Sequence, residues 1–218
     1  MARPRSAGYD DQREHILRQA AALFAAQGYA ATSMNQVAGA CGVSKAALYH
    51  YVRDKNELLA DVAEAHVLRL EAVVDEIVAQ QRPPADHLRA LISAFVHEYA
   101  SAQNEHRVLT EDVALLAEDE RARVLGVQRR VVAAFSSAVG QYRPALQGAD
   151  LHKPLTMLLF GMINWMFTWF RPNGPLSHEQ MAPLVADLFM GGLQALQPES
   201  ISPSPSPSPF PNVKETTQ

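Results

Sequence analysis

The sequence predicts an all-α fold of about nine helices, in which an N-terminal three-helix unit precedes a larger helical body. Apolar residues recur at intervals of three and four along most of the chain, whereas the alternating pattern of strands is nearly absent. Ser/Asp-x-x-Gln/Glu sequences mark several helix starts. Of the 218 residues, 48% are hydrophobic, so the chain can bury a sizeable core.

Local signals define the first three helices. An apolar stripe over residues 16–27 predicts a helix that ends at Gly28, a residue suited to a left-handed C-terminal cap. Ser33-x-x-Gln36 forms a capping box for the second helix. Gly42 then ends the second helix, and Ser44 can cap a third.

Longer helices follow until a tail in which serine and proline alternate. Asp54-x-x-Glu57 opens a helix predicted to reach about Gln81, ahead of Pro83-Pro84. Later apolar stripes, the last of them after the capping box Ser177-x-x-Gln180, cover residues 88–99, 109–116, 124–142, 155–170 and 181–196. We expect an N-terminal unit over residues 1–53, a helical body over 54–198 and a disordered tail over 199–218.

Charge and composition exclude several protein classes. The net charge is −4, yet residues 1–60 carry seven Lys and Arg against five Asp and Glu, so a mildly basic unit precedes an acidic body. Cys41 is the only cysteine, which excludes an intrachain disulfide, and the first residues lack a secretory signal. Residues 155–170 are apolar but shorter than the roughly 20 residues that span a bilayer. We expect a soluble, cytoplasmic protein that does not contact a membrane.

The spacing of the second and third helices is typical of a helix-turn-helix. Val37 and Ala38 lie on the second helix, Gly42 follows in the turn, and Leu48 and Tyr51 lie on the third. Small and apolar residues at these places hold two helices at a close, fixed crossing. The outer face of the third helix is then free to enter the major groove of DNA.

The predicted DNA contacts lie at the start of this third helix and at neighbouring helix ends. Lys45 can reach a phosphate or a guanine edge, and the small Ala46 and Ala47 admit close approach. Tyr49 and His50 can bond the flanking phosphates. The candidate DNA-binding residues are Thr32, Ser33, Ser44, Lys45, Ala46, Ala47, Tyr49, His50 and Lys55, although Thr32 and Ser33 could serve only as caps.

At these residues the chain resembles the TetR family of one-component transcriptional regulators. The resemblance rests on "AALFAAQGYAATSMNQVAGACGVSKAALYHYVRDKNELL" (21–59), with a Phe-x-x-x-Gly-Tyr element at its start and Leu-Tyr-x-x-Val-x-x-Lys-x-x-Leu near its end. It implies an N-terminal DNA-binding domain and a larger helical domain for ligand binding and dimerisation. It also implies DNA contacts at Thr32, Ser44, Lys45, Ala47, Tyr49, His50 and Lys55.

The stretch "FGMINWMFTWFRPNGPLSHEQMAPLVADLFMGGL" (160–193) is similar to members of that family whose ligand is often a CoA thioester, including repressors that respond to phenylacetyl-CoA. Aromatic and thioether side chains suit a bulky apolar ligand, although any one of them could be an ordinary core residue. The candidate ligand-binding residues are Phe95, Tyr99, His106, Met162, Asn164, Trp165, Met166 and Trp169. Arginines at positions 121, 123, 129, 130 and 171 could meet a CoA phosphate, but most of them fit a solvated surface better.

The apolar pattern of the C-terminal helices predicts a homodimer. Residues 155–170 are apolar on every side of a helix, so a partner subunit is expected to cover one side. Two helices from each subunit would form a four-helix interface, and two recognition helices about 34–36 Å apart would read a palindromic operator. The predicted interface residues are Leu155, Leu159, Phe170, Val185, Leu188, Phe189 and Leu193.

The sequence therefore predicts a repressor that binds operator DNA as a dimer and is released by a small apolar effector, an acyl- or aryl-CoA thioester such as phenylacetyl-CoA. A sensor of amphipathic drugs that controls an efflux pump is the alternative among regulators. An enzyme and a DNA-free interaction adaptor are the alternatives from other classes. The sequence holds no HExxH motif, paired cysteines, nucleophile elbow or phosphate-binding loop, so we predict no catalytic residue, metal site or cofactor.

Overall fold

The N-terminal unit forms from the predicted capping signals. The computed structural model describes residues 7–171 and 174–197. The first helix, α1 (Ala7–Gln27), ends at Gly28, whose φ of +85° is the left-handed conformation expected there. The Ser33 capping box opens α2 (Met34–Ala40), and Ser44 Oγ accepts a hydrogen bond from Ala47 N at 3.1 Å to open α3 (Lys45–Leu48).

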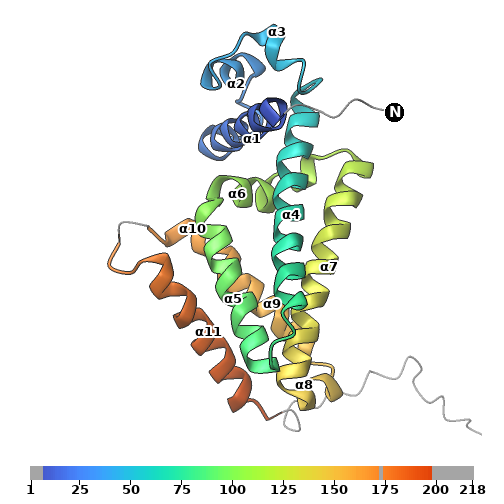
Figure 1. The fold of residues 1–218 in the computed structure, drawn as a ribbon, viewed down its shortest axis with the longest axis vertical. Coiled ribbons are helices and arrows are strands. Elements are labelled where there is room, and N and C mark those ends of the chain that lie inside the picture. Colours follow the sequence, from blue (N-terminus) through green and yellow to red (C-terminus); the bar gives the residue numbers. More distant parts are fainter. Residues whose placement is uncertain (1–6, 172–173, 198–218) are drawn as a thin grey trace, which may run out of the picture.

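The long helix α4 (Lys55–Ala79) joins this unit to the rest of the chain (Figure 1). Asp54 caps it by accepting from Glu57 N at 2.9 Å. The second hydrogen bond of the predicted capping box, from Asp54 N to the Glu57 side chain, does not form. The Glu57 carboxylate accepts from Arg53 N instead. The helix ends slightly before the predicted Gln81, and Pro84 begins the next helix at a position where its missing N–H costs nothing.

Seven further helices and one 3-10 turn complete the described chain. They are α5 (Pro84–Ser101), α6 (Gln103–Glu111), η1 (Val113–Leu115), α7 (Glu118–Tyr142), α8 (Pro144–Gly148), α9 (His152–Asn164), α10 (Met166–Trp169) and α11 (His178–Ala195). The described residues contain no strand, which confirms the all-α prediction. Two short helices exceed the predicted set, because Pro144 opens α8 and Trp165 divides the apolar stretch into α9 and α10.

The body is a bundle in which α4, α5 and α7 contact one another and α9 packs on α7 (Figure 1). The helix α11 lies along α5, and α6 bridges the bundle to α1. Three aromatic rings form the centre of the core: Phe135 lies 4.6 Å from Phe95 and 5.0 Å from Phe160, measured between ring centroids. All three are buried, so this contact fixes how α5, α7 and α9 meet.

Two further predictions concern the C-terminal tail and the membrane. The disordered tail predicted over 199–218 lies outside the described residues. Among the helices that are described, none is both long and apolar enough to cross a membrane.

Candidate functional site

The recognition surface on α3 is exposed where the sequence places DNA contacts. Ser44, Lys45 and Ala46 are exposed, and so are Tyr49 and His50 just beyond the helix. Ala47 is partly covered. On the other side Leu48 is fully buried in one core with Val37 and Ala38 of α2, so the two helices are held together by apolar contact. The positive φ of Gly42 allows the tight turn between them.

Three further predicted DNA contacts have partners within the protein. Thr32 is only 2% exposed, and its hydroxyl donates to Gly28 O at 2.9 Å and accepts from Gln27 Nε2. The Thr32 side chain therefore stabilises the α1–α2 loop, which contradicts its placement on a DNA-facing surface. Ser33 remains exposed but caps α2. The Lys55 ammonium donates to three loop carbonyls, as described below.

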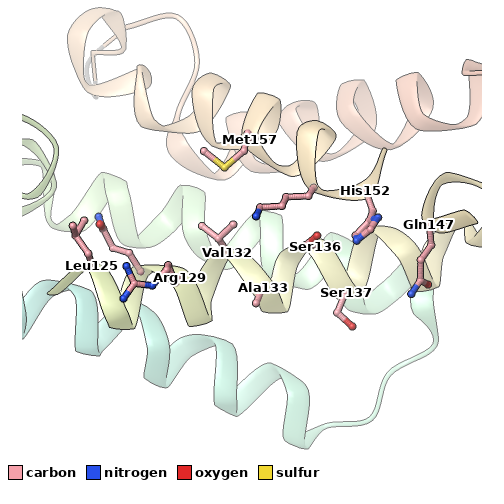
Figure 2. Close-up of a pocket in the computed structure, with 11 residues that line it drawn as sticks. Leu125, Arg129, Val132, Ala133, Ser136, Ser137, Gln147, His152 and Met157 are labelled. Carbon is pink, nitrogen blue, oxygen red and sulfur yellow. The ribbon is translucent and has the colours of Figure 1, made fainter. Parts of the chain in front are cut away.

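An open cleft of about 650 Å³ lies between α7 and α9 (Figure 2). We call it the outer cleft, and its lining residues are Leu125, Gln128, Arg129, Val132, Ala133, Ser136, Ser137, Gln147, His152, Lys153 and Met157. Met157 of α9 points toward Val132 of α7, so the middle of the cleft is apolar. Arg129 and Lys153 add two cations, and within the described chain neither forms an ion pair. The cleft thus combines an apolar floor with free positive charge.

A smaller cavity of about 180 Å³ adjoins this cleft. We call it the inner chamber, and its lining residues are Val67, Leu70, Tyr99, His106, Leu109, Thr110, Gln128, Val131, Val132, Met157, Phe160 and Asn164. Gln128, Val132 and Met157 line both cavities, so the two are neighbours through these side chains. Residues from α4, α5, α6, α7 and α9 meet in the chamber, which places the long helix α4 in direct reach of any occupant.

A buried histidine pair lies beside the inner chamber. His66 Nε2 of α4 is 3.4 Å from His106 Nδ1 of α6, and Arg69 Nη2 is 3.3 Å from His66 Nδ1. Burial lowers the pKa of His66 to about 3 and that of His106 to about 4, so both rings are neutral near pH 7. Since arginine can only donate, His66 carries its proton on Nε2 and donates it to His106. The chamber is therefore polar but uncharged.

Comparison with known proteins identifies the family. Residues 16–62 match the domain described as "Bacterial regulatory proteins, tetR family", and residues 81–193 match "Tetracyclin repressor-like, C-terminal domain". The chain belongs to the TetR family of bacterial transcriptional regulators. This confirms the predicted family and the all-α fold, and it makes the protein a DNA-binding regulator and not an enzyme.

Individual relatives of this TetR-family regulator support the same assignment. A TetR-family regulator from Bordetella parapertussis 12822 has 34% identity and a TM-score of 0.78, over 85% of this chain and 97% of that one. The transcriptional repressor KstR2 of Mycobacterium tuberculosis is 25% identical over 84% of this chain and 94% of its own length. AibR, solved with isovaleryl coenzyme A and operator DNA, has 27% identity and a TM-score of 0.72, over 81% and 97% of the two chains.

The predicted ligand-binding residues of the TetR-family body fall into three separate places. Tyr99, His106 and Asn164 line the inner chamber. Phe95 does not, because it is fully buried in the aromatic core. The remaining four, Met162, Trp165, Met166 and Trp169, line a different cavity of about 450 Å³ on the outside of α9, α10 and α11. Trp165 is 65% exposed and Trp169 is 55% exposed, so the prediction of an interior ligand contact is wrong for them.

The predicted dimer residues also divide between inside and outside. Leu159, Phe170, Val185, Phe189 and Leu193 are each at most 8% exposed, because they pack into the core of their own chain. Leu155 is half-buried, and only Leu188, at 66%, is well exposed. The buried residues of α9 and α11 lie on the sides that contact α5 and α7, so a partner subunit cannot cover them as predicted. The outward face carries Leu158, Gly161, Trp165, Trp169, Leu184 and Leu188, which we call the outer apolar surface.

The sequence pattern does not reveal the outer cleft. Arg129 stands in the sequence only as one of five candidate arginines, and Gln128, His152 and Lys153 are not among the predicted ligand contacts. The available signal was on α7, where Leu125, Arg129, Val132 and Ser136 share one side of the helix at intervals of three and four. Arg123 and Arg130, by contrast, form ion pairs with Glu64 and Glu71 of α4, which distinguishes them from Arg129.

Proposed function

We propose that the protein is a dimeric repressor that leaves its operator when it binds an acyl- or aryl-CoA thioester, with phenylacetyl-CoA as the leading candidate. The observation that carries the proposal is the pairing of an uncharged inner chamber with a cationic outer cleft. An acyl thioester has the same two-part character, since a small neutral group is attached to a long carrier that bears phosphates. The acyl group occupies the inner chamber and the phosphates lie near Arg129 and Lys153.

The size and charge of the cavities support one class of effector over others. The inner chamber, about 180 Å³, has roughly the volume of six water molecules, which suits a short acyl chain or a single aromatic ring. His106, which lines it, and the adjacent His66 are both neutral, so the lining offers no cation to a free carboxylate. The relative AibR, which is complexed with isovaleryl coenzyme A, is consistent with a short acyl group. A cationic drug would be repelled by Arg129 and Lys153, which disfavours the efflux-pump alternative.

The route from effector to DNA runs through α4. Val67 and Leu70 of α4 line the chamber, and His66 of α4 is hydrogen-bonded to His106, which also lines it. At its other end α4 is tied to α1 by an ion pair of 2.7 Å between Asp61 Oδ2 and Arg13 Nη2. An occupant that shifts α4 therefore shifts the helix-turn-helix. The effector changes operator affinity only by the difference between its affinities for the two positions of α4.

Dimerisation completes the proposal. The outer apolar surface on α9, α10 and α11 exposes two tryptophans and several leucines, which a second copy of the chain covers. A two-fold arrangement presents two α3 helices to successive major grooves of a palindromic operator. The affinity of each half-site is modest alone, so a change in the spacing of the two α3 helices is enough to release the DNA.

The test is a titration of the protein bound to a labelled duplex from the promoter of its own gene. Phenylacetyl-CoA and isovaleryl-CoA should release the DNA at low concentration. Phenylacetate lacks the phosphates and free CoA lacks the acyl group, so each should require at least about a hundredfold more. If no thioester releases the DNA, the proposed effector class is wrong.

Variants of the outer cleft sharpen this experiment. Replacing Arg129 and Lys153 by serine removes the two cations of the cleft, which form no ion pair within the described part of the chain. The concentration of thioester needed for release should therefore rise about tenfold or more. Arg121→Ser, an exposed arginine of the same helix that does not line the cleft, is the matched control and should leave the titration unchanged. An equal effect of Arg121→Ser would indicate a general loss of positive charge and would contradict the site.

A further inference from the structure

Lys55 begins α4 at a position that disfavours its charge. The N-terminus of a helix carries partial positive charge, so acidic residues are preferred in the first turn and an ammonium is not. The neighbouring positions follow this rule, with Asp54 as the cap and Glu57 in the first turn. Contacts outside its own helix would offset this unfavourable placement of the Lys55 ammonium.

Those contacts come from the loop between α1 and α2. Lys55 Nζ donates to Tyr29 O at 2.9 Å, Ala30 O at 3.3 Å and Thr32 O at 2.9 Å. An ammonium has three N–H donors, so these three carbonyls use all of them. The same atom lies 4.3 Å from the centroid of the Tyr29 ring, a cation–π distance. The ammonium also sits just beyond the C-terminus of α1, where the helix dipole favours a cation.

A second contact links the same two segments. Tyr29 Oη donates to Asn56 Oδ1, so both Lys55 and its neighbour are attached to the α1–α2 loop. Thr32 closes the loop internally through its buried hydroxyl, and Ser33 follows directly as the cap of α2. The loop therefore connects the first turn of α4 firmly to the start of α2. The helix α3 in turn packs against α2.

We propose that Lys55 is a positioning residue for DNA recognition, the joint through which α4 sets the orientation of α2 and α3, and that it does not bind a phosphate. The geometry separates it from Lys45, whose side chain is exposed on α3. Lys45 acts on DNA directly. Lys55 acts through the loop carbonyls. It influences DNA affinity only by fixing the orientation of the helix-turn-helix.

The salt dependence of DNA binding distinguishes the two roles. Each phosphate contact contributes about 0.9 to the slope of log affinity against log salt, so loss of one contact per subunit lowers the slope of a dimer by about 1.8. Lys45→Met should show this reduction. Lys55→Met, which keeps most of the length of the side chain but removes the ammonium, should weaken binding to the promoter duplex about tenfold or more. The slope should stay that of the wild type. Binding is measured at 25 °C, and circular dichroism melting of each variant shows whether it is folded at that temperature.

Two results would overturn the proposal: a slope reduced as in Lys45→Met, or promoter affinity equal to that of the wild type. Should Lys55→Met be unfolded at 25 °C, Tyr29→Phe carries the test, since it keeps the ring beneath the ammonium and removes only the hydroxyl that reaches Asn56. That variant should also bind the promoter more weakly, with the same slope of log affinity against log salt as the wild type. Unchanged affinity would refute the proposed positioning role.

Discussion

At the scale of single residues, the pair His66 and His106 links stability to pH. Each ring is at most 2% exposed, and burial lowers the two pKa values to about 3 and about 4 from an ordinary value near 6.5. Below pH 6.5 the unfolded chain binds protons that the folded chain does not, so the free energy of unfolding decreases as the pH falls. Each histidine contributes at most about 1.4 kcal/mol per pH unit between pH 6.5 and about 4.

Thermal melting at a fixed protein concentration between pH 7.5 and pH 5 checks this expectation. The melting temperature should fall more steeply with acid in the wild type than in His66→Gln/His106→Gln, even though the double variant is less stable at neutral pH. His97→Gln is the control, because His97 is exposed and, among the described residues, its ring bonds to the carbonyl of Ser93 alone. Parallel curves for the wild type and the double variant would show that the pair is not responsible.

At the scale of elements, the ends of helices are determined by a few residues whose effect can be separated. Gly28 adopts φ +85° after α1, whereas Gly39 is helical and exposed within α2, and a Cβ at either position would meet no atom within 4 Å. Gly28→Ala should therefore lower the free energy of unfolding by about 1–2 kcal/mol through backbone strain alone. Gly39→Ala should instead raise it by about 0.5–1 kcal/mol. Urea unfolding measures both, and a neutral Gly28→Ala would refute the strain argument.

The same local character explains how much of the fold the sequence predicts. Caps at Ser33, Ser44 and Ser177 and the break at Gly28 depend on neighbouring residues, so the sequence locates these helix ends correctly. The rotation of a helix about its axis depends on what packs against it. In the stretch from Leu155 to Phe170 apolar residues lie on all sides, so the pattern cannot say which side faces the core.

Cavities are even less predictable, because distant elements create them. Aromatic and polar character predicts ligand contacts at Tyr99, His106 and Asn164, which do line the inner chamber. The same character also selects Phe95 and Trp165, which do not line it. Likewise, the place of Lys55 at a helix start predicts a phosphate contact. Its hydrogen bonds to three loop carbonyls become visible only in the folded structure. Long-range geometry decides these roles.

At the scale of the whole molecule, the outer apolar surface predicts the state of assembly. Leu188 is 66% exposed and lies with Leu184 and Trp165 on the outside of α9 and α11, where water would otherwise contact it. A glutamate at this position would bury a charge in each half of a two-fold interface, which costs several kcal/mol unless the subunits separate. Leu188→Glu should therefore be a monomer at micromolar concentration by light scattering, while the wild type is a dimer.

Leu115→Glu provides a matched control, because Leu115 is also a well-exposed leucine, at 58%, but lies on η1 and outside the cavity that α9, α10 and α11 form. It should remain dimeric. The monomeric Leu188→Glu protein should still fold, since its core does not include this side chain, yet it should bind the promoter duplex far more weakly than the wild type, because one α3 helix reads only a half-site. A dimeric Leu188→Glu variant would place the interface elsewhere, and a monomeric wild type would refute dimerisation. Either result would remove the physical basis proposed for the spacing of the two recognition helices.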